Sequence, residues 1–229
     1  MEKNGLEVLI PMLLEQTSIP RIRLSSIEPT DVTDKLIEEL SKSTRICNHF
    51  HIPVQSCSNK ILELMKRKYT IEEYIDRINT IRKYIKNVTI TTDIMIGFPN
   101  ETEEDFEQSI YYCKKIGFDK LHIFPYSDRY GTVASKMQNK LSSEVIRERK
   151  KRLIELDKEL HKKSFDKALG TIKEVIVEEI NNRDDICKGT SKDYFKVEFY
   201  STKAMKNDIL NLKIIDYDLE KFVLKGQII

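Results

Sequence analysis

Residues 91–106 read TTDIMIGFPNETEEDF, and this stretch decides the expected fold of the first part of the chain. An apolar run ends at Gly97, a short turn follows, and Thr102 begins a helix as its N-cap, with Asp105 in the reach-back position. The acidic first turn suits the positive end of the helix dipole. Ligands of open α/β sheets collect at the carboxyl ends of strands, where this turn lies. The turn is therefore either a ligand site or an ordinary connection.

The same pattern recurs along the first part of the chain. After an expected helix at 6–16, short β-rich runs cover residues 21–25, 47–53, 88–97 and 119–125, and apolar residues at helical spacing lie between them. This alternation predicts an α/β fold with parallel strands and right-handed crossovers. The turns that follow the last three strands should line one rim. Four strands are too few for a closed eight-stranded barrel, so we expect an open, partial (β/α) barrel that begins within a domain.

The periodicity changes after Gly131. A long amphipathic helix is expected over about residues 142–166. Short strands separated by polar turns are then expected at residues 171–180, 194–200, 209–215 and 222–229. Strands of this length predict a small antiparallel β-barrel. We therefore expect two domains, residues 1–168 and residues 169–229.

Composition restricts the classes of protein to which the chain can belong. Of its 229 residues 40% are hydrophobic and 33% are charged, and no apolar run approaches the roughly 20 residues that cross a bilayer. No signal peptide is recognisable, so we expect a soluble, cytoplasmic protein without a membrane partner. The four cysteines are scattered without CxxC spacing, and we expect neither a disulfide framework nor a metal site from them. Residues 136–173 hold 12 Lys or Arg against 6 Asp or Glu, which indicates either a polyanion-binding surface or a solvated helix face.

Four motifs in order along the chain resemble the methylthiotransferases of the radical S-adenosylmethionine (SAM) superfamily. They are RIRLSSIEP at 21–29, HIPVQS at 51–56, DIMIGFP at 93–99 followed by Glu101-Thr102, and FPYS at 124–127 followed by Gly131-Thr132. The wording is most similar to the branch that acts on threonylcarbamoyladenosine at position 37 of tRNA. Residues 168–229 are similar to the TRAM domain, an RNA-binding β-barrel of this family.

The resemblance implies a transferase that 2-methylthiolates this adenosine, using SAM and two 4Fe-4S clusters in the full-length enzyme. The family's cluster-binding cysteine motifs have no counterpart here. We therefore expect the C-terminal portion of a longer enzyme, a partial radical SAM barrel followed by a TRAM barrel, which binds no cluster and is inactive alone. Two alternatives stay open, a non-catalytic RNA-binding or scaffold protein and the sibling activity on isopentenyladenosine. The expected partner is tRNA, and the exposed strand at 21–25 predicts self-association.

The resemblance also implies which residues contact cofactor and RNA, although it assigns none to catalysis. The expected cofactor-binding residues are Ser25, Glu28, Gln55, Ser56, Asp93, Gly97 and Pro99. The expected RNA-binding residues are Tyr126, Arg129, Lys192, Tyr194 and Lys196.

Several of these side chains have a structural alternative. Glu28 either binds a cationic group or caps a helix that begins at Thr30, and Glu101 is expected to be a helix-end residue rather than a catalyst. His49 and His51 are expected to point to opposite faces of their strand, which argues against a shared metal ion.

Overall fold

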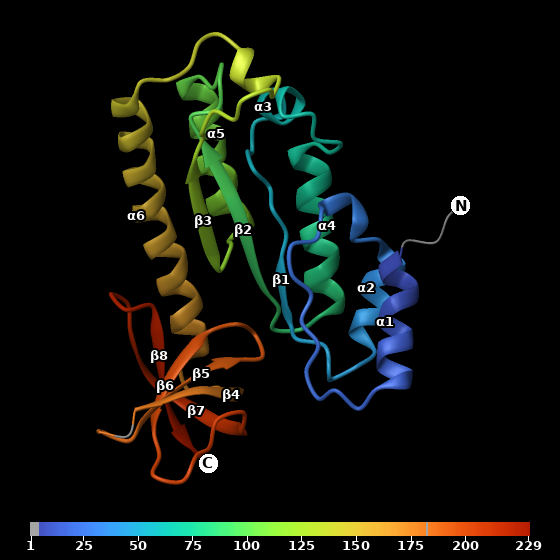
Figure 1. Ribbon diagram of the computed structural model, residues 1–229, viewed down its shortest axis with the longest axis vertical. Coiled ribbons are helices and arrows are strands. Elements are labelled where there is room, and N and C mark those ends of the chain that lie inside the picture. The colour runs from blue at the N-terminus through green and yellow to red at the C-terminus, as the bar shows by residue number, and fades with distance from the viewer. Residues whose placement is uncertain (1–4, 182) are drawn as a thin grey trace.

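The computed structural model describes residues 5–181 and 183–229, so residues 1–4 and 182, which fall within the expected domains, lie outside it (Figure 1). Its centre is a sheet of three parallel strands in the order β1 (His49–His51), β2 (Thr89–Ile96) and β3 (Lys120–Pro125). Thr91 of β2 lies opposite His51 on one side and Lys120 on the other. The predicted parallel α/β arrangement is confirmed.

The expected first strand, 21–25, is not a strand of this sheet. It touches the segment before β1 through one bridge, Ile22 to Ile46, in which the Ile22 amide donates to the Arg45 carbonyl and the Cys47 amide donates to the Ile22 carbonyl. The next main-chain hydrogen bond between this segment and β1 is the one that the Ile27 amide donates to the His51 carbonyl. Ser26 has φ +51°, and this left-handed turn interrupts the extended backbone that a continuous ladder requires.

Helices cover the sheet and bury one large core. On one side Figure 1 shows α1 (Gly5–Gln16), α2 (Asp34–Ser41) and α4 (Ile71–Tyr84) close together, and the short α3 (Asn59–Leu64) lies above them. A 3-10 turn, Pro29–Asp31, precedes α2. Helix α5 (Glu103–Ile116) connects β2 to β3 along the chain, and it begins with the predicted capping box at Thr102. The largest fully buried side chains of this core belong to Tyr74, Phe50, Phe106 and Phe118.

A long helix, α6 (Ser143–Ala168), runs from a short 3-10 turn (Ala134–Lys136) at one end of the sheet to the C-terminal barrel at the other (Figure 1). Leu153, Leu156 and Leu160 of α6 belong to the sheet core. Phe165 and Ala168, at the end of the same helix, belong to a second core inside the barrel. One helix therefore supplies side chains to both cores.

The barrel is closed and has five strands, where the sequence predicted four. They are β4 (Ile172–Asn181), β5 (Ile186–Ser191), β6 (Lys196–Tyr200), β7 (Ile209–Asp218) and β8 (Val223–Ile228), in the order β4-β5-β6-β8-β7. The missed strand is β5, whose sequence ICKGTS has few β-favouring residues. Strand β5 forms through its pairing with β4 and β6, and both of these pairs are antiparallel. The expectation of a wholly antiparallel barrel is wrong at one place, because β6 and β8 pair in parallel. Within the described residues no helix is long and apolar enough to span a bilayer.

A substitution at Gly189 of β5 tests how closely β5 packs against β4. A Cβ at this position would lie well inside the van der Waals contact distance of the Ile176 carbonyl oxygen and 2.6 Å from Cγ1 of Val175. Since backbone cannot yield as a side-chain tip can, we expect Gly189→Ala to lower the free energy of unfolding by at least about 2 kcal/mol in urea titrations followed by circular dichroism. Gly5→Ala, which places a Cβ in open space, is the control and should change it by less than about 0.5 kcal/mol. Equal stability of the two variants would contradict the packing described for β4 and β5.

Candidate cofactor and RNA site

The turn that follows β2 has one backbone conformation, and two residues in left-handed geometry define it. Gly97 has φ +75° and Asn100 has φ +69°, as the tolerance of asparagine for this region allows. The Glu101 amide donates to the Phe98 carbonyl at 3.0 Å and closes the turn. A Cβ at Gly97 would lie 2.7 Å from Cγ1 of Ile146 on α6, so the turn also packs closely against that helix.

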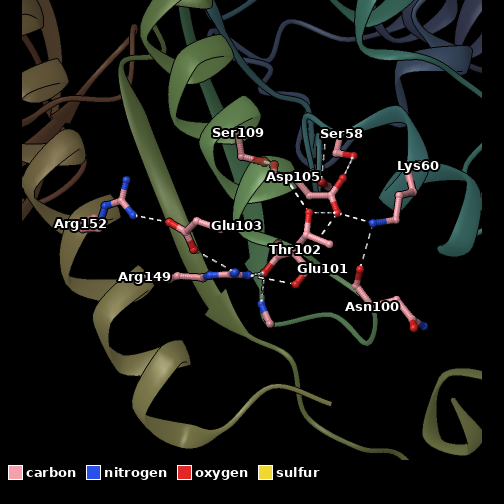
Figure 2. Close-up of polar contacts among 12 residues, drawn as sticks. Ser58, Lys60, Asn100, Glu101, Thr102, Glu103, Asp105, Ser109, Arg149 and Arg152 are labelled. Carbon is pink, nitrogen blue, oxygen red and sulfur yellow. Dashed lines mark hydrogen bonds and ion pairs between the residues drawn. The ribbon is translucent and has the colours of Figure 1, made fainter. Parts of the chain in front are cut away.

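A buried ion pair holds this turn in place (Figure 2). Glu101 Oε2 accepts the Gly97 amide at 2.7 Å and the Arg149 Nη1 at 2.5 Å. The side chains of Glu101 and Arg149 are 1% and 5% exposed. Burial raises the pKa of Glu101, and the Gly97 amide and the Arg149 guanidinium act in the opposite direction. Glu101 is therefore not a free helix-end residue, because it joins the strand end to α6.

Asp105 ties the start of α5 to the loop after β1 (Figure 2). Its carboxylate accepts the Ser58 hydroxyl at 2.7 Å, the Lys60 Nζ at 2.6 Å and the Thr102 amide at 2.9 Å. Burial alone would raise the pKa of Asp105, but the hydrogen bonds from Lys60, Ser58 and Thr102 lower it to about 2. The loops that follow β1 and β2 are thereby joined through one carboxylate.

The structure divides the expected cofactor residues into two groups and one outlier. The first group, at the strand ends, is Gln55, Ser56, Gly97 and Pro99. Gln55 is bonded to β2 through its main chain, because its amide donates to the Asp93 carbonyl and its carbonyl accepts the Met95 amide. Gln55 has φ +63°, and Ser56 is buried. The outlier is Glu28, which is exposed, makes no helix-cap hydrogen bond and pairs with Arg67 at 2.7 Å. The capping alternative is thus not observed for Glu28, and its binding to a cationic group of a ligand stays a prediction.

The second group, Ser25 and Asp93, lines a separate pocket of about 320 Å³ that does not include the strand-end residues of the first group. The other lining residues are Arg23, Leu24, Ser26, His49, His51, Thr91, His122 and Tyr194. His49 and His51 both contact Thr91 Oγ1, at 3.0 Å and 2.9 Å. Their expected placement on opposite faces is wrong, because residues two apart on a strand share a face. Among the described residues no group of three or more His, Cys, Asp or Glu side chains is arranged for a metal ion.

The expected RNA-binding residues also separate into two groups. Tyr126 and Arg129 lie in the loop after β3, where Tyr126 contacts Phe98 edge-on and its hydroxyl donates to Asp128. Three barrel residues already have protein contacts. Lys192 Nζ donates to the Thr44 carbonyl, Lys196 pairs with Glu178 at 2.8 Å, and the Tyr194 ring stacks on His49 with centroids 4.2 Å apart. Tyr194 remains 44% exposed, so part of its ring is accessible.

Arg149 is the residue of this site that sequence reasoning missed. It lies on the same face of α6 as Leu153, Leu156 and Leu160, at i, i+4, i+7 and i+11. A single basic residue on an otherwise apolar helix face was the available signal, because burying an arginine requires an acidic partner. The identity of that partner, Glu101, depends on the fold.

Comparison with known proteins gives a consistent family. A model of the radical SAM superfamily matches residues 4–113. The chain is 40% identical over 200 residues to threonylcarbamoyladenosine tRNA methylthiotransferase MtaB of Bacillus subtilis, an alignment that covers 86% of this chain and 44% of that protein. It is 38% identical over 207 residues to the tRNA-2-methylthio-N(6)-dimethylallyladenosine synthase of Lachnoclostridium phytofermentans, covering 90% and 45%. The chain thus spans less than half the length of these curated relatives.

A solved structure shares the fold over much of the chain. Coproporphyrinogen III oxidase (HemN) of Escherichia coli, described as a radical SAM enzyme, superimposes with a TM-score of 0.57. The two chains are 17% identical, and the match covers 70% of this chain and 38% of that one. At this identity the likeness concerns the arrangement of strands and helices alone. It agrees with a parallel sheet that forms part of an open barrel.

The buried ion pair predicts a large stability effect. Arg149→Met leaves the Glu101 carboxylate buried without its cation, and we expect a loss of about 3–5 kcal/mol in the free energy of unfolding. Arg152→Met is the matched control on the same helix, since the more exposed Arg152 pairs with the exposed Glu103 and Glu107 and should cost under about 1 kcal/mol. Adding Glu101→Gln to Arg149→Met should recover part of the loss. Equal costs for the two arginine variants would contradict the assignment.

The lowered pKa of Asp105 predicts a pH dependence with a definite sign. A carboxyl whose folded-state pKa is depressed contributes stability above its unfolded pKa, and that contribution disappears as pH falls through the folded value. The advantage of the wild-type chain over Asp105→Asn should therefore be complete above the ordinary value of 3.8 and should vanish as pH falls through about 2. Its size should be about 1–2 kcal/mol. An advantage that stays constant over this range in acid-unfolding titrations would show that Asp105 has an ordinary pKa.

Proposed function

The chain belongs to the radical SAM methylthiotransferase family, and from this membership we propose that it forms the part of a tRNA-modifying enzyme that binds the adenosine portion of SAM and the tRNA. The proposed reaction is 2-methylthiolation of N6-threonylcarbamoyladenosine at position 37. The observation that carries the proposal is the rigid turn Gly97–Asn100 at the carboxyl end of a parallel strand, fixed by the buried Glu101 and Arg149. Such strand ends are where open α/β sheets bind ligands.

The residues present fit SAM better than they fit an iron-sulfur cluster. Gly97 is buried against Ile146 and shapes the turn at the strand end, whereas a separate pocket offers hydroxyl and carboxylate groups from Ser25 and Asp93, as ribose or an amino acid requires. A cluster needs several thiolates in one locality. Cys47, Cys57 and Cys113 of the sheet domain are buried free cysteines, and no cluster site of three ligands is found among the described residues. In the full-length enzyme a 4Fe-4S cluster held outside this chain would supply the electron that cleaves SAM to a carbon radical, and the residues described here would bind and orient SAM.

We propose the closed five-stranded barrel as a TRAM domain that binds RNA together with the exposed face of α6. Arg147, Lys150, Lys151 and Lys158 line one shallow surface of α6, and only Lys158 among them has an acidic partner in the described chain, Glu220. Unpaired cations on a helix face attract a phosphate backbone. The proposed domains are residues 1–168 and 169–229, and the proposed location is the cytoplasm, where tRNA is modified.

The choice of substrate rests on the rim motifs and on relatives of both kinds. SSIEP at 25–29 and HIFPYS at 122–127 agree with the threonylcarbamoyladenosine branch. The relative with that substrate in its name is 40% identical, and the relative named for dimethylallyladenosine is 38% identical, so identity alone does not separate them. We prefer threonylcarbamoyladenosine as the substrate because of these two motifs.

Deletion of the gene in the organism that encodes it tests the proposal. We expect 2-methylthio-N6-threonylcarbamoyladenosine to disappear from digested tRNA, with N6-threonylcarbamoyladenosine accumulating in its place, as measured by mass spectrometry of nucleosides. Restoring the wild-type gene is the control. Restoring Gly97→Val should fail, since the added side chain meets Ile146 and disfavours the positive φ. Loss of the dimethylallyl derivative would assign the sibling activity instead, and unchanged nucleosides would leave a non-catalytic RNA-binding role.

A further inference from the structure

Four polar side chains form a continuous chain of two hydrogen bonds and one ion-pair contact across one face of the sheet. His49 Nε2 lies 3.0 Å from Thr91 Oγ1, His51 Nδ1 lies 2.9 Å from the same oxygen, and His51 Nε2 lies 3.2 Å from Asp93 Oδ1. The chain starts at the buried His49, which is 3% exposed, and ends at Asp93 on the pocket wall. These residues come from two neighbouring strands, β1 and β2, that pair in register.

Hydrogen-bond chemistry fixes the direction of this chain. The negative charge of the Asp93 carboxylate, 3.2 Å from His51 Nε2, favours a proton on this nitrogen, because a carboxylate can only accept. Whenever His51 is neutral, its Nδ1 has a lone pair and must accept the single hydroxyl proton of Thr91. The Thr91 oxygen then accepts from His49, whose proton is on Nε2. His49 Nδ1 is left as a bare lone pair, and it is one of the buried atoms without a hydrogen-bond partner.

The surroundings of His49 favour this neutral state. Burial, with the charge of Arg23 and the neighbouring His51 and His122, lowers the pKa of His49 to about 3. At the other end of the chain, His51 is close to Asp93 and to His122. The His122 ring contacts the His51 ring edge-on, with centroids 5.3 Å apart, and Lys120 and Asp157 are the further charged groups near His122. No hydrogen-bond acceptor within the described residues contacts His49 Nδ1, which agrees with an unprotonated nitrogen there.

The C-terminal barrel reaches the buried end of the chain through Tyr194. Its ring stacks on His49 at an interplanar angle of 18°, and Cζ of Arg23 lies 4.5 Å from the ring centroid. Tyr194 has φ +75°, a conformation that costs a bulky residue free energy and is retained only where the surroundings impose it. The same loop is fixed to the sheet because the Thr89 hydroxyl donates to the Asp193 carbonyl at 2.6 Å and Arg23 Nη2 donates to the Ser191 carbonyl at 3.2 Å.

We propose that Tyr194 is a positioning residue for Asp93. The tyrosine fixes the His49 ring, and the directed chain through Thr91 and His51 holds Asp93 Oδ1, so that the second carboxylate oxygen is oriented toward the pocket. That oxygen accepts a hydrogen bond from a hydroxyl or amino group of a nucleoside. Only the identity of the ligand rests on the proposed function, because the chain itself is a property of the protein. Docking of the barrel and the geometry of the pocket are thereby coupled.

The proposal makes a definite statement about histidine tautomers, which NMR of the full chain labelled with ¹⁵N-histidine tests directly. Long-range nitrogen–proton correlations should show that His49 is protonated at Nε2 alone and that neutral His51 is also protonated at Nε2 alone. Thr91→Val should convert both to tautomer mixtures, while Thr91→Ser should keep the wild-type pattern. Tyr194→Leu should convert His49 to a mixture, whereas Tyr194→Phe, which retains the ring, should not. His161 on α6 is the internal control for folding.

A proton on His49 Nδ1 in the wild-type chain would overturn the proposal, as would identical spectra for Tyr194→Leu and Tyr194→Phe with His161 unchanged. If Thr91→Val alters His161 and therefore the fold, the Tyr194 pair decides. Calorimetric titration with S-adenosylhomocysteine tests the ligand separately. Affinity should fall about tenfold in Tyr194→Leu and stay unchanged in Tyr194→Phe. A wild-type chain with the expected tautomers that binds no S-adenosylhomocysteine would refute the proposed cofactor site and leave the positioning chain intact.

Discussion

The buried pair of Glu101 and Arg149 is the interaction on which the rest of the site depends. A carboxylate that is 1% exposed is tolerated only when its charge and lone pairs are satisfied, and here one guanidinium and one main-chain amide do this. That amide belongs to Gly97, so the electrostatic requirement of a core residue fixes the backbone at the end of β2. The turn has one arrangement because every alternative leaves a charge without a partner.

Helix α6 extends this constraint across the molecule. Its inner face begins with Arg149 at the turn, continues with leucines against the sheet and ends with Phe165 in the barrel core. The barrel then returns to the sheet through the loop that ends at Tyr194. The two parts are therefore joined by the covalent helix and also by side-chain contacts, among them the stacking of Tyr194 on His49 and the hydrogen bond from Lys192 to the Thr44 carbonyl. The start of α6 therefore holds the strand ends through Arg149, and the barrel at its other end contacts the pocket through Tyr194.

Short-range signals in the sequence were sufficient for part of this. The capping box of Thr102 and Asp105 and the parallel pairing of the strands were predicted, because each depends on neighbouring residues or on simple alternation. Strand 21–25 was wrong because the single residue Ser26 turns the backbone. The faces of His49 and His51 were wrong because the two-residue period of a strand was misapplied. The pairing of Arg149 with Glu101 and the docking of Tyr194 on His49 join residues 48 and 145 positions apart, and no spacing rule reaches that far.

The shared helix also determines how the protein loses its structure. At about 1.5 Å per residue, the 26 residues of α6 extend roughly 39 Å, from the rim of the sheet to the interior of the barrel. Melting the barrel core releases Phe165 and Ala168 and exposes the last turns of the helix, which then fray toward Leu160 and Leu156 in the sheet core. Opening of one part therefore lowers the stability of the other. We therefore expect the two hydrophobic cores to unfold as one cooperative unit, with amide protons in both exchanging through a common global opening.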